Sequence, residues 1–146
     1  MPRQQFRFCH RLRVRWAEVD RQDIVFNGHY LTYFDVGMTE YCRAAGIPYP
    51  EGFTEAGTDL FAVATRLDYH GSATFDDLLD VCVRIARIGH SSIRFEFEIH
   101  RDQAHLVSGE LVYVNADPAT REAVRVPEFV REAVRRFEGR DPSGRD

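Results

Sequence analysis

Hydrophobic and polar residues alternate strictly over residues 11–16, the hexapeptide RLRVRW. The alternation places Leu12, Val14 and Trp16 on one face and three arginines on the other. A period of two residues is typical of a β-strand with one buried face. The first element is therefore predicted to be a half-buried strand, with Trp16 on its apolar face.

The period changes after Asn27, where apolar side chains recur at steps of three and four residues as far as Ala45. This spacing builds a continuous apolar stripe along one side of a helix. Asn27 precedes the stripe as the expected N-cap, and Gly46 follows it as a stop signal. The pattern predicts one long helix over about residues 28–45.

A loop rich in proline and glycine follows at residues 47–59 and could form a flap over a pocket. Beyond it, short polar turns separate extended segments, and short turns favour antiparallel neighbours. We therefore expect an antiparallel meander. Its four strands are residues 60–69, 78–88, 92–100 and 105–115.

A last amphipathic segment begins at Pro127, a residue favoured in the first position of a helix, and carries Phe129 and Phe137 at helical spacing. It predicts a short C-terminal helix at the end of a single domain, residues 1–138, before a polar, frayed tail at 139–146. The order of elements indicates an α+β fold. In it, the long helix covers one face of a five-stranded antiparallel sheet.

Composition narrows the choice of partners. The 146 residues are 44% hydrophobic and have a formal net charge of -4, without a run of five like charges, which argues against nucleic acid or an anionic membrane as a partner. No segment approaches the ~20 apolar residues of a membrane-spanning helix, and the N-terminus lacks an apolar signal-peptide core. We expect a cytoplasmic protein.

Cys9, Cys42 and Cys82 are odd in number and widely spaced within apolar patterns. We interpret all three as thiols in or near the core, because neither a disulfide framework nor a CxxC site is indicated. The six histidines are scattered, and the chain has no HExxH motif, GxSxG elbow or phosphate-binding glycine loop. The sequence therefore predicts no metal site and no cofactor.

Asp20 stands between the first strand and the long helix. A carboxylate at this junction can face the positive end of the helix, where the first backbone N–H groups have no partner inside the helix. Such an arrangement can attack a carbonyl and stabilise the oxyanion that forms. Taken alone, Asp20 is better explained as an ordinary turn residue.

The surrounding residues give Asp20 a context, because the segment from Val14 to Pro50 resembles the hotdog-fold acyl-CoA thioesterases of the 4-hydroxybenzoyl-CoA thioesterase type. The order of motifs downstream is similar as well, so the resemblance covers about residues 10 to 130. The residues that carry it are Asp20, Ile24-Val25-Phe26, Tyr30, Tyr33-Phe34-Asp35, Ala45-Gly46-Ile47-Pro48, Tyr69-His70, Phe75-Asp76-Asp77 and Gly89-His90-Ser91-Ser92.

The resemblance implies a sheet wrapped around the central helix and a homodimer or homotetramer with active sites at the protomer interface. It also implies that Asp20 is the catalytic carboxylate, acting as a nucleophile or as a base that activates water. The N–H groups near Asn27 and Gly28 would then receive the oxyanion. The implied substrate is an acyl-CoA, so that CoA belongs to the substrate and is not a cofactor.

Two other functions stay open. The chain could hydrolyse thioesters of acyl carrier protein, in which case the three arginines of the first strand could dock an acidic helix or could simply face solvent. It could also be an acyl-binding hotdog module without turnover. A binding module has no use for a carboxylate aimed at a thioester carbonyl, so Asp20 distinguishes these cases.

Several further residues are expected to bind substrate, each with a structural alternative. Tyr30 belongs to the core stripe and could also touch the acyl group, whereas His29 could line the site or lie on the surface. Asp35 could bind a polar acyl tail across the interface or make a structural hydrogen bond. The full set is Gly28, His29, Tyr30, Asp35, His90, Ser91 and Ser92, the last three in a turn that approaches the pantetheine arm in such families.

Two positions depart from the family pattern. Asp23 stands where relatives usually have glycine, so the local backbone could differ, and its carboxylate could raise the pKa of Asp20 if the two approach. Gly37-Met38 replaces an Ala-Arg pair, which puts the usual polar contacts of the helix in doubt. Both departures bear on the substrate more than on the catalytic acid.

Overall fold

The computed structural model describes residues 5–143. Helices and strands follow the predicted order, with a short helix added in the loop after the long one. The elements are β1 (Phe8–Arg13), a 3-10 helix (Trp16–Glu18), α1 (His29–Ala45), α2 (Glu51–Thr54), β2 (Asp59–Tyr69), β3 (Leu78–Ile88), β4 (Ser92–Arg101), β5 (Ala104–Ala116) and α3 (Glu128–Glu138).

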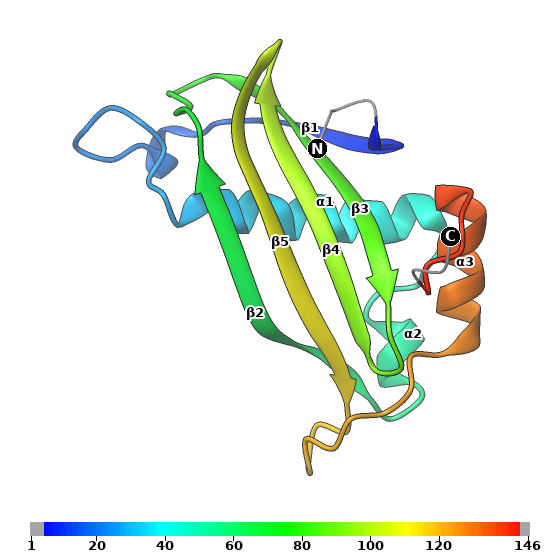
Figure 1. The fold of residues 1–146 in the computed structure, drawn as a ribbon. Coiled ribbons are helices and arrows are strands. Elements are labelled where there is room, and N and C mark those ends of the chain that lie inside the picture. Colours follow the sequence, from blue (N-terminus) through cyan, green and yellow to red (C-terminus); the bar gives the residue numbers. More distant parts are fainter. Residues whose placement is uncertain (1–4, 144–146) are drawn as a thin grey trace.

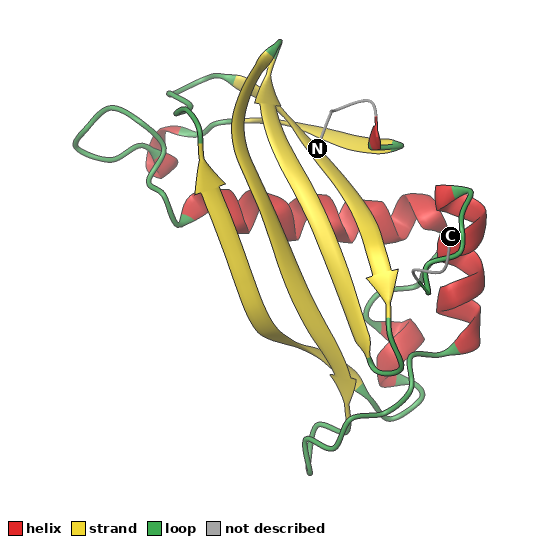
Figure 2. Cartoon of the chain, in the orientation of Figure 1, coloured by secondary structure: helices red, strands yellow, loops and turns green. Residues whose placement is uncertain are grey.

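The five strands form one antiparallel sheet in the order β1-β3-β4-β5-β2. Figure 1 shows α1 lying across one face of this sheet, with α2 and α3 near the C-terminal end of α1. In Figure 2 the loops lie mainly at the ends of the strands and not at the centre of the sheet. The expected α+β architecture, a five-stranded antiparallel sheet around one long helix, is confirmed.

The expected meander is right for β3, β4 and β5 but wrong for β2. This strand pairs with β5, for example Leu67 opposite Gly109, and forms the edge of the sheet remote from β1. The connection at residues 70–77 is therefore a crossing segment and not a tight turn. The paired aspartates at its end suggested a hairpin, although the connection is long enough to reach the opposite side.

Aromatic packing joins α1 to the sheet. Phe34 is 1% exposed and stacks on Phe97 of β4, with ring centroids 4.7 Å apart. One turn later, Gly37 brings the helix so close to β3 that an added Cβ would lie 2.8 Å from the Val81 side chain. Gly37 therefore allows α1 to pack closely against β3. This role does not need the Ala-Arg pair that the family pattern has at Gly37-Met38.

The predicted position of Trp16 is wrong. β1 ends at Arg13, and the chain then turns through the 3-10 helix, so that Trp16 is 74% exposed and packs edge-on against Phe75. Glu18 takes the inward direction and is 7% exposed. The alternation of hydrophobic and polar residues continues past Arg13, where β1 ends. It therefore does not indicate where the backbone leaves the extended conformation.

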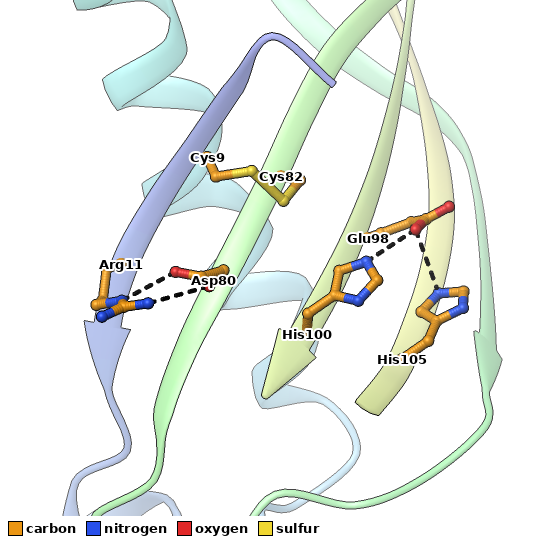
Figure 3. Close-up of a disulfide and its surroundings, with 7 residues drawn as sticks. All are labelled: Cys9, Arg11, Asp80, Cys82, Glu98, His100 and His105. Atoms are coloured by element: carbon orange, nitrogen blue, oxygen red, sulfur yellow. Dashed lines mark hydrogen bonds and ion pairs between the residues drawn. A yellow bond between two sulfur atoms is a disulfide. The ribbon is translucent and has the colours of Figure 1, made fainter. Parts of the chain in front are cut away.

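The interpretation of the cysteines is wrong for two of the three. Cys9 on β1 and Cys82 on β3 face each other in register and are joined by a disulfide (Figure 3). Cys9 is also exposed, whereas Cys42 is a buried free thiol whose pKa is raised to about 12 by burial. A spacing of 73 residues could not indicate the pairing, because it depends on which strands become neighbours.

The C-terminal segment also differs in detail. Pro127 is the N-cap of α3, and Phe129 is 45% exposed. The expected fraying is wrong for residues 139–143, because the Arg140 side chain donates to the carbonyls of Ile85 and Ala86 and the Ile88 N–H donates to the Pro142 carbonyl. Residues 144–146 lie outside the described part. Within residues 5–143, no helix is long and apolar enough to cross a membrane.

Candidate active site

Asp20 lies in a tight turn between β1 and α1. Its N–H donates to the Ile24 carbonyl and its carbonyl accepts from the Asp23 N–H, both at 2.9 Å. The Gln22 N–H donates to Asp20 Oδ1 at 2.8 Å. The turn therefore fixes one carboxylate oxygen with a backbone donor and leaves the direction of the side chain well defined.

Asp23 completes this turn with a φ of 62°. That value lies in the left-handed region, which glycine enters most easily and aspartate tolerates better than most residues. The departure from the family pattern thus retains a backbone conformation suited to glycine.

Glu18 is hydrogen-bonded to residues on both sides of the Asp20 turn. Its carboxylate accepts hydrogen bonds from the Tyr33 hydroxyl and from the Arg15 N–H, both at 2.8 Å, and its carbonyl accepts from the Phe26 N–H at 3.0 Å. Burial favours the neutral acid, but the hydrogen bonds from Arg15 and Tyr33 outweigh it, so the pKa of Glu18 is lowered. Glu18 is therefore in its charged form in the folded protein at neutral pH.

Replacing Glu18 with Gln is expected to lower the free energy of unfolding at pH 7 by about 1–3 kcal/mol, because buried hydrogen bonds to a charged group are lost. The lowered pKa means that this stabilisation is full above the unfolded-state value near 4.5 and disappears as the pH falls through the folded-state value. Urea denaturation at pH 7 and pH 3 measures the difference. A gap between wild type and variant that is equal at both pH values would contradict this origin, and Glu55→Gln, at an exposed position, is the control.

The first turn of α1 lies next to Asp20. The expected capping role of Asn27 is wrong, because Gly28 occupies the N-cap position and makes no side-chain capping hydrogen bond. The Asn27 carbonyl instead accepts from the Tyr69 hydroxyl at 3.2 Å, and the His29 N–H donates to the Phe26 carbonyl at 2.9 Å. The start of α1 thus has no side-chain cap to compete with an incoming oxyanion.

A hollow of about 180 Å³, here called the Asp20 hollow, brings together three predicted site residues, Asp20, Asn27 and Tyr30. The Tyr30 hydroxyl is held in its wall by the Ala73 N–H, at 3.0 Å. The complete lining is Asp20, Gln22, Ile24, Val25, Asn27, Tyr30, Tyr69, Gly71 and Ser72. The Asp20 carboxylate and the start of α1 therefore meet in one concave site.

A second hollow of about 340 Å³, here called the Asp35 groove, lies beside the next residues of α1 and contains two more predicted site residues, Gly28 and Asp35. Its wall comes from α1, β2 and β5. The lining is Gly28, Leu31, Thr32, Phe34, Asp35, Ala62, Thr65, Leu111 and Tyr113. The groove is mainly apolar, with one carboxylate.

The remaining predicted residues lie elsewhere. His29 packs edge-on against Phe26, with ring centroids 5.7 Å apart, and lines neither of these two hollows. His90 and Ser91 lie in the β3–β4 turn and Ser92 begins β4, at the end of that strand opposite Arg101. Because β4 has 10 residues, about 30 Å separate its ends. Arg101 donates to Ser72, which lines the Asp20 hollow, so within one chain this turn is far from the hollow. Figure 1 shows the β3–β4 turn and the loop before α1 at opposite ends of the sheet.

The sequence did not reveal the far wall of the Asp20 hollow, which the crossing segment after β2 supplies. The Arg101 side chain fixes this segment by donating to the Ser72 carbonyl at 3.1 Å and to Asp77 Oδ2 at 2.9 Å. Burial opposes ionisation of Asp77, yet hydrogen bonds from Thr74 and Arg101 lower its pKa overall. Tyr69 and Ser72 could have been found only by knowing that β2 ends beside α1.

Comparisons with known proteins identify the family of this fold. Residues 22–108 match the family model described as thioesterase superfamily. The chain is 25% identical over 126 residues to the acyl-CoA thioesterase YbgC of Haemophilus influenzae, covering 86% of this chain and 93% of that protein.

Two solved structures have a similar fold. A Thermus thermophilus thioesterase, described as complexed with coenzyme A and Zn, has a TM-score of 0.79 and 25% identity over 94% of this chain and 98% of its own. A DHNA-CoA thioesterase from Staphylococcus aureus has a TM-score of 0.82 and 17% identity over 90% of each chain. Both likenesses extend over nearly the whole sheet and helix.

Proposed function

The chain belongs to the thioesterase superfamily, and we propose that it hydrolyses acyl-CoA thioesters to the free acid and CoA. One observation carries the proposal: the Asp20 carboxylate and the start of α1 line the same hollow. The more specific likeness to the 4-hydroxybenzoyl-CoA type stays a prediction, because the relatives carry different substrate names.

In the proposed reaction, the thioester carbonyl lies at the first turn of α1, between the Asp20 hollow and the Asp35 groove. The N–H groups of Asn27 and Gly28 donate to the carbonyl oxygen as it becomes negative. One such donor typically contributes about 3–4 kcal/mol to lowering the barrier. The positive end of the helix adds to this stabilisation because α1 has 17 residues and points its N-terminus at the site.

Asp20 supplies the other half of the reaction. Its Oδ1 is held by the Gln22 N–H, so Oδ2 is the oxygen assigned to the reaction. This oxygen either attacks the carbonyl carbon, giving a mixed anhydride and CoA thiolate, or takes a proton from a water molecule that attacks instead. In the first path, water then hydrolyses the anhydride and regenerates the Asp20 carboxylate. The products of both paths are the carboxylic acid and CoA.

The acyl group is assigned to the Asp35 groove, whose apolar wall suits an aliphatic or aromatic chain. Asp35 would then meet a polar substituent of that chain. His29 has no assigned contact in this arrangement, and Tyr30 supports the hollow through its hydrogen bond to Ala73.

CoA is favoured over acyl carrier protein as the thiol carrier. The three arginines that could dock an acidic partner are each paired with a carboxylate: Arg11 with Asp80 at 3.0 Å, Arg13 with Asp76 at 3.2 Å and Arg15 with Glu18 at 2.9 Å. Docking a carrier protein would have to compete with these pairs. The coenzyme A in the related Thermus structure also supports this choice.

A homodimer or homotetramer is part of the proposal. β2 is an edge strand of the sheet, and its Val63 side chain is 60% exposed, so the strand offers unpaired backbone groups and apolar surface to a second copy. A second copy is also what could bring the His90–Ser92 turn to the Asp20 hollow. Sedimentation equilibrium tests this, and a strictly monomeric active enzyme would refute the shared site.

The substrate assignment predicts release of free thiol from acyl-CoAs, measured with a thiol reagent on a panel of aliphatic and aromatic acyl groups. Acyl carrier protein thioesters with the same acyl groups are the matched comparison, and we expect the larger kcat/KM for acyl-CoAs. Preference for the carrier protein would select the alternative enzyme. Tight acyl-CoA binding without release of thiol would select the non-catalytic acyl-binding module.

A further inference from the structure

The sheet face turned away from α1 carries a compact polar cluster. Alternate residues of β4 point away from the helix, and among them Glu98 is 2% exposed and His100 is 6% exposed. His105 joins them from β5 (Figure 3). Strand pairing thus brings two of the six histidines next to one buried carboxylate.

A local irregularity of the sheet aligns this cluster. The register of β4 and β5 shifts between Ile99 and His100, which places His100 directly opposite His105. Such irregularities redirect side chains at particular positions of a sheet. The two imidazole rings consequently stack at an angle of 18°, with centroids 4.9 Å apart.

The donor atoms converge on one carboxylate oxygen. His100 Nε2 lies 2.9 Å from Glu98 Oε1, and His105 Nε2 lies 3.8 Å from the same oxygen. One ligating atom from each residue lies within 4.8 Å of the others. Donors bound to one zinc ion at tetrahedral angles are about 3.3 Å apart, given metal–ligand bonds of about 2.0–2.1 Å. The observed separations lie on both sides of that value.

We propose that Glu98, His100 and His105 form a binding site for a divalent transition metal ion of the zinc type. Two imidazoles and one carboxylate are a donor set suited to zinc and its first-row neighbours, whereas calcium and magnesium prefer oxygen donors alone. On binding, the metal replaces the proton between His100 and Glu98, which passes to solvent. It also takes His105 Nε2 away from the Val107 carbonyl, which lies 3.1 Å from that nitrogen. Three protein ligands leave a coordination position for water.

The place of this cluster suggests what a bound ion does. His105 packs against His70, with ring centroids 4.7 Å apart, and the N–H groups of His70 and Gly71 both donate to the Leu106 carbonyl. Gly71 lines the Asp20 hollow. A metal that fixes His105 would therefore hold the β4–β5 hairpin and stiffen the wall of that hollow from the opposite face of the sheet, without touching the substrate.

Cobalt titration tests the site directly. Protein dialysed against a chelator and then titrated with CoCl₂ should bind one equivalent, with visible absorption bands that ZnCl₂ abolishes by competition. His105→Gln, at the most exposed ligand, and Glu98→Gln should each weaken binding by at least ~100-fold, since even changes to residues behind the ligands cost 10–100-fold. His10→Gln, a histidine of β1 outside the cluster, should bind as the wild type does.

Stability supplies a second readout. Excess ZnCl₂ should raise the melting temperature of wild type and of His10→Gln by about 5 °C or more, and should leave both cluster variants unchanged. Circular dichroism establishes that each variant is folded before titration. The proposal is overturned if wild type binds no stoichiometric cobalt, or if binding survives in both cluster variants, which would place the ion elsewhere.

Discussion

Replacing Asp20 with Asn should lower kcat by ~100- to 10,000-fold while the melting temperature changes little. Asn retains the shape of the side chain, and its oxygen can still accept from the Gln22 N–H, so the turn is expected to persist. It cannot act as a carboxylate nucleophile or as a base, functions that typically contribute factors of ~100 to 10,000. Thiol release under saturating acyl-CoA measures the effect.

The matched control is Asp23→Gly in the same turn. Glycine suits the φ of 62° at this position, so the variant should fold and retain most of the activity. Undiminished activity in Asp20→Asn would refute the proposed catalytic role. A pH–rate profile of Asp23→Gly that is shifted from that of wild type would identify Asp23 as a group that tunes Asp20.

The two catalytic roles left open for Asp20 differ in a covalent intermediate. If Asp20 is the nucleophile, acid quenching during a single turnover should leave the acyl group on the peptide that contains Asp20, which mass spectrometry detects. If Asp20 activates water, thiol release should be complete without any acylated peptide.

Phe34→Ala should lower the free energy of unfolding by about 3–5 kcal/mol. The ring is 1% exposed, stacks on Phe97 and meets Phe95 edge-on at 5.7 Å. Removing it leaves a cavity between α1 and the sheet that neighbouring rings cannot fill without leaving their own contacts. For a domain of this size, the loss corresponds to a fall in melting temperature of about 10 °C.

Phe129→Ala provides the control for that measurement. Phe129 lies on α3 and is 45% exposed, so its truncation should change the free energy of unfolding by less than about 1 kcal/mol. Chemical denaturation of both variants gives the comparison. Equal losses at the two positions would mean that α1 is not held to the sheet by Phe34.

Local sequence patterns were sufficient to predict the elements whose conformation depends on residues close in sequence. The stripe through Tyr30 and Phe34 predicted α1 to within one residue at its start, because helical spacing depends only on neighbours in sequence. The alternation of Ile93, Phe95 and Phe97 predicted β4 for the same reason. The family resemblance then directed attention to Asp20, which the structure places in a hollow at the start of α1.

Features that depend on strand order could not be predicted in this way. The disulfide requires that β1 pair with β3, and the Glu98–His100–His105 cluster requires a register shift between β4 and β5. The wall formed by Ser72 requires β2 to end beside α1. No local sequence pattern indicates these pairings, so they could be identified only from the folded structure.

The Asp20 hollow and the Asp35 groove meet at the start of α1, but no residue in the described lining of one belongs to the lining of the other. The parts of the molecule assigned to bond cleavage and to recognition of the acyl group can therefore diverge independently. Substitutions at Ala62, Thr65 or Leu111 could retune substrate range during evolution or in the laboratory while the cleavage machinery stays intact. The scaffold is in that sense modular at a scale smaller than a domain.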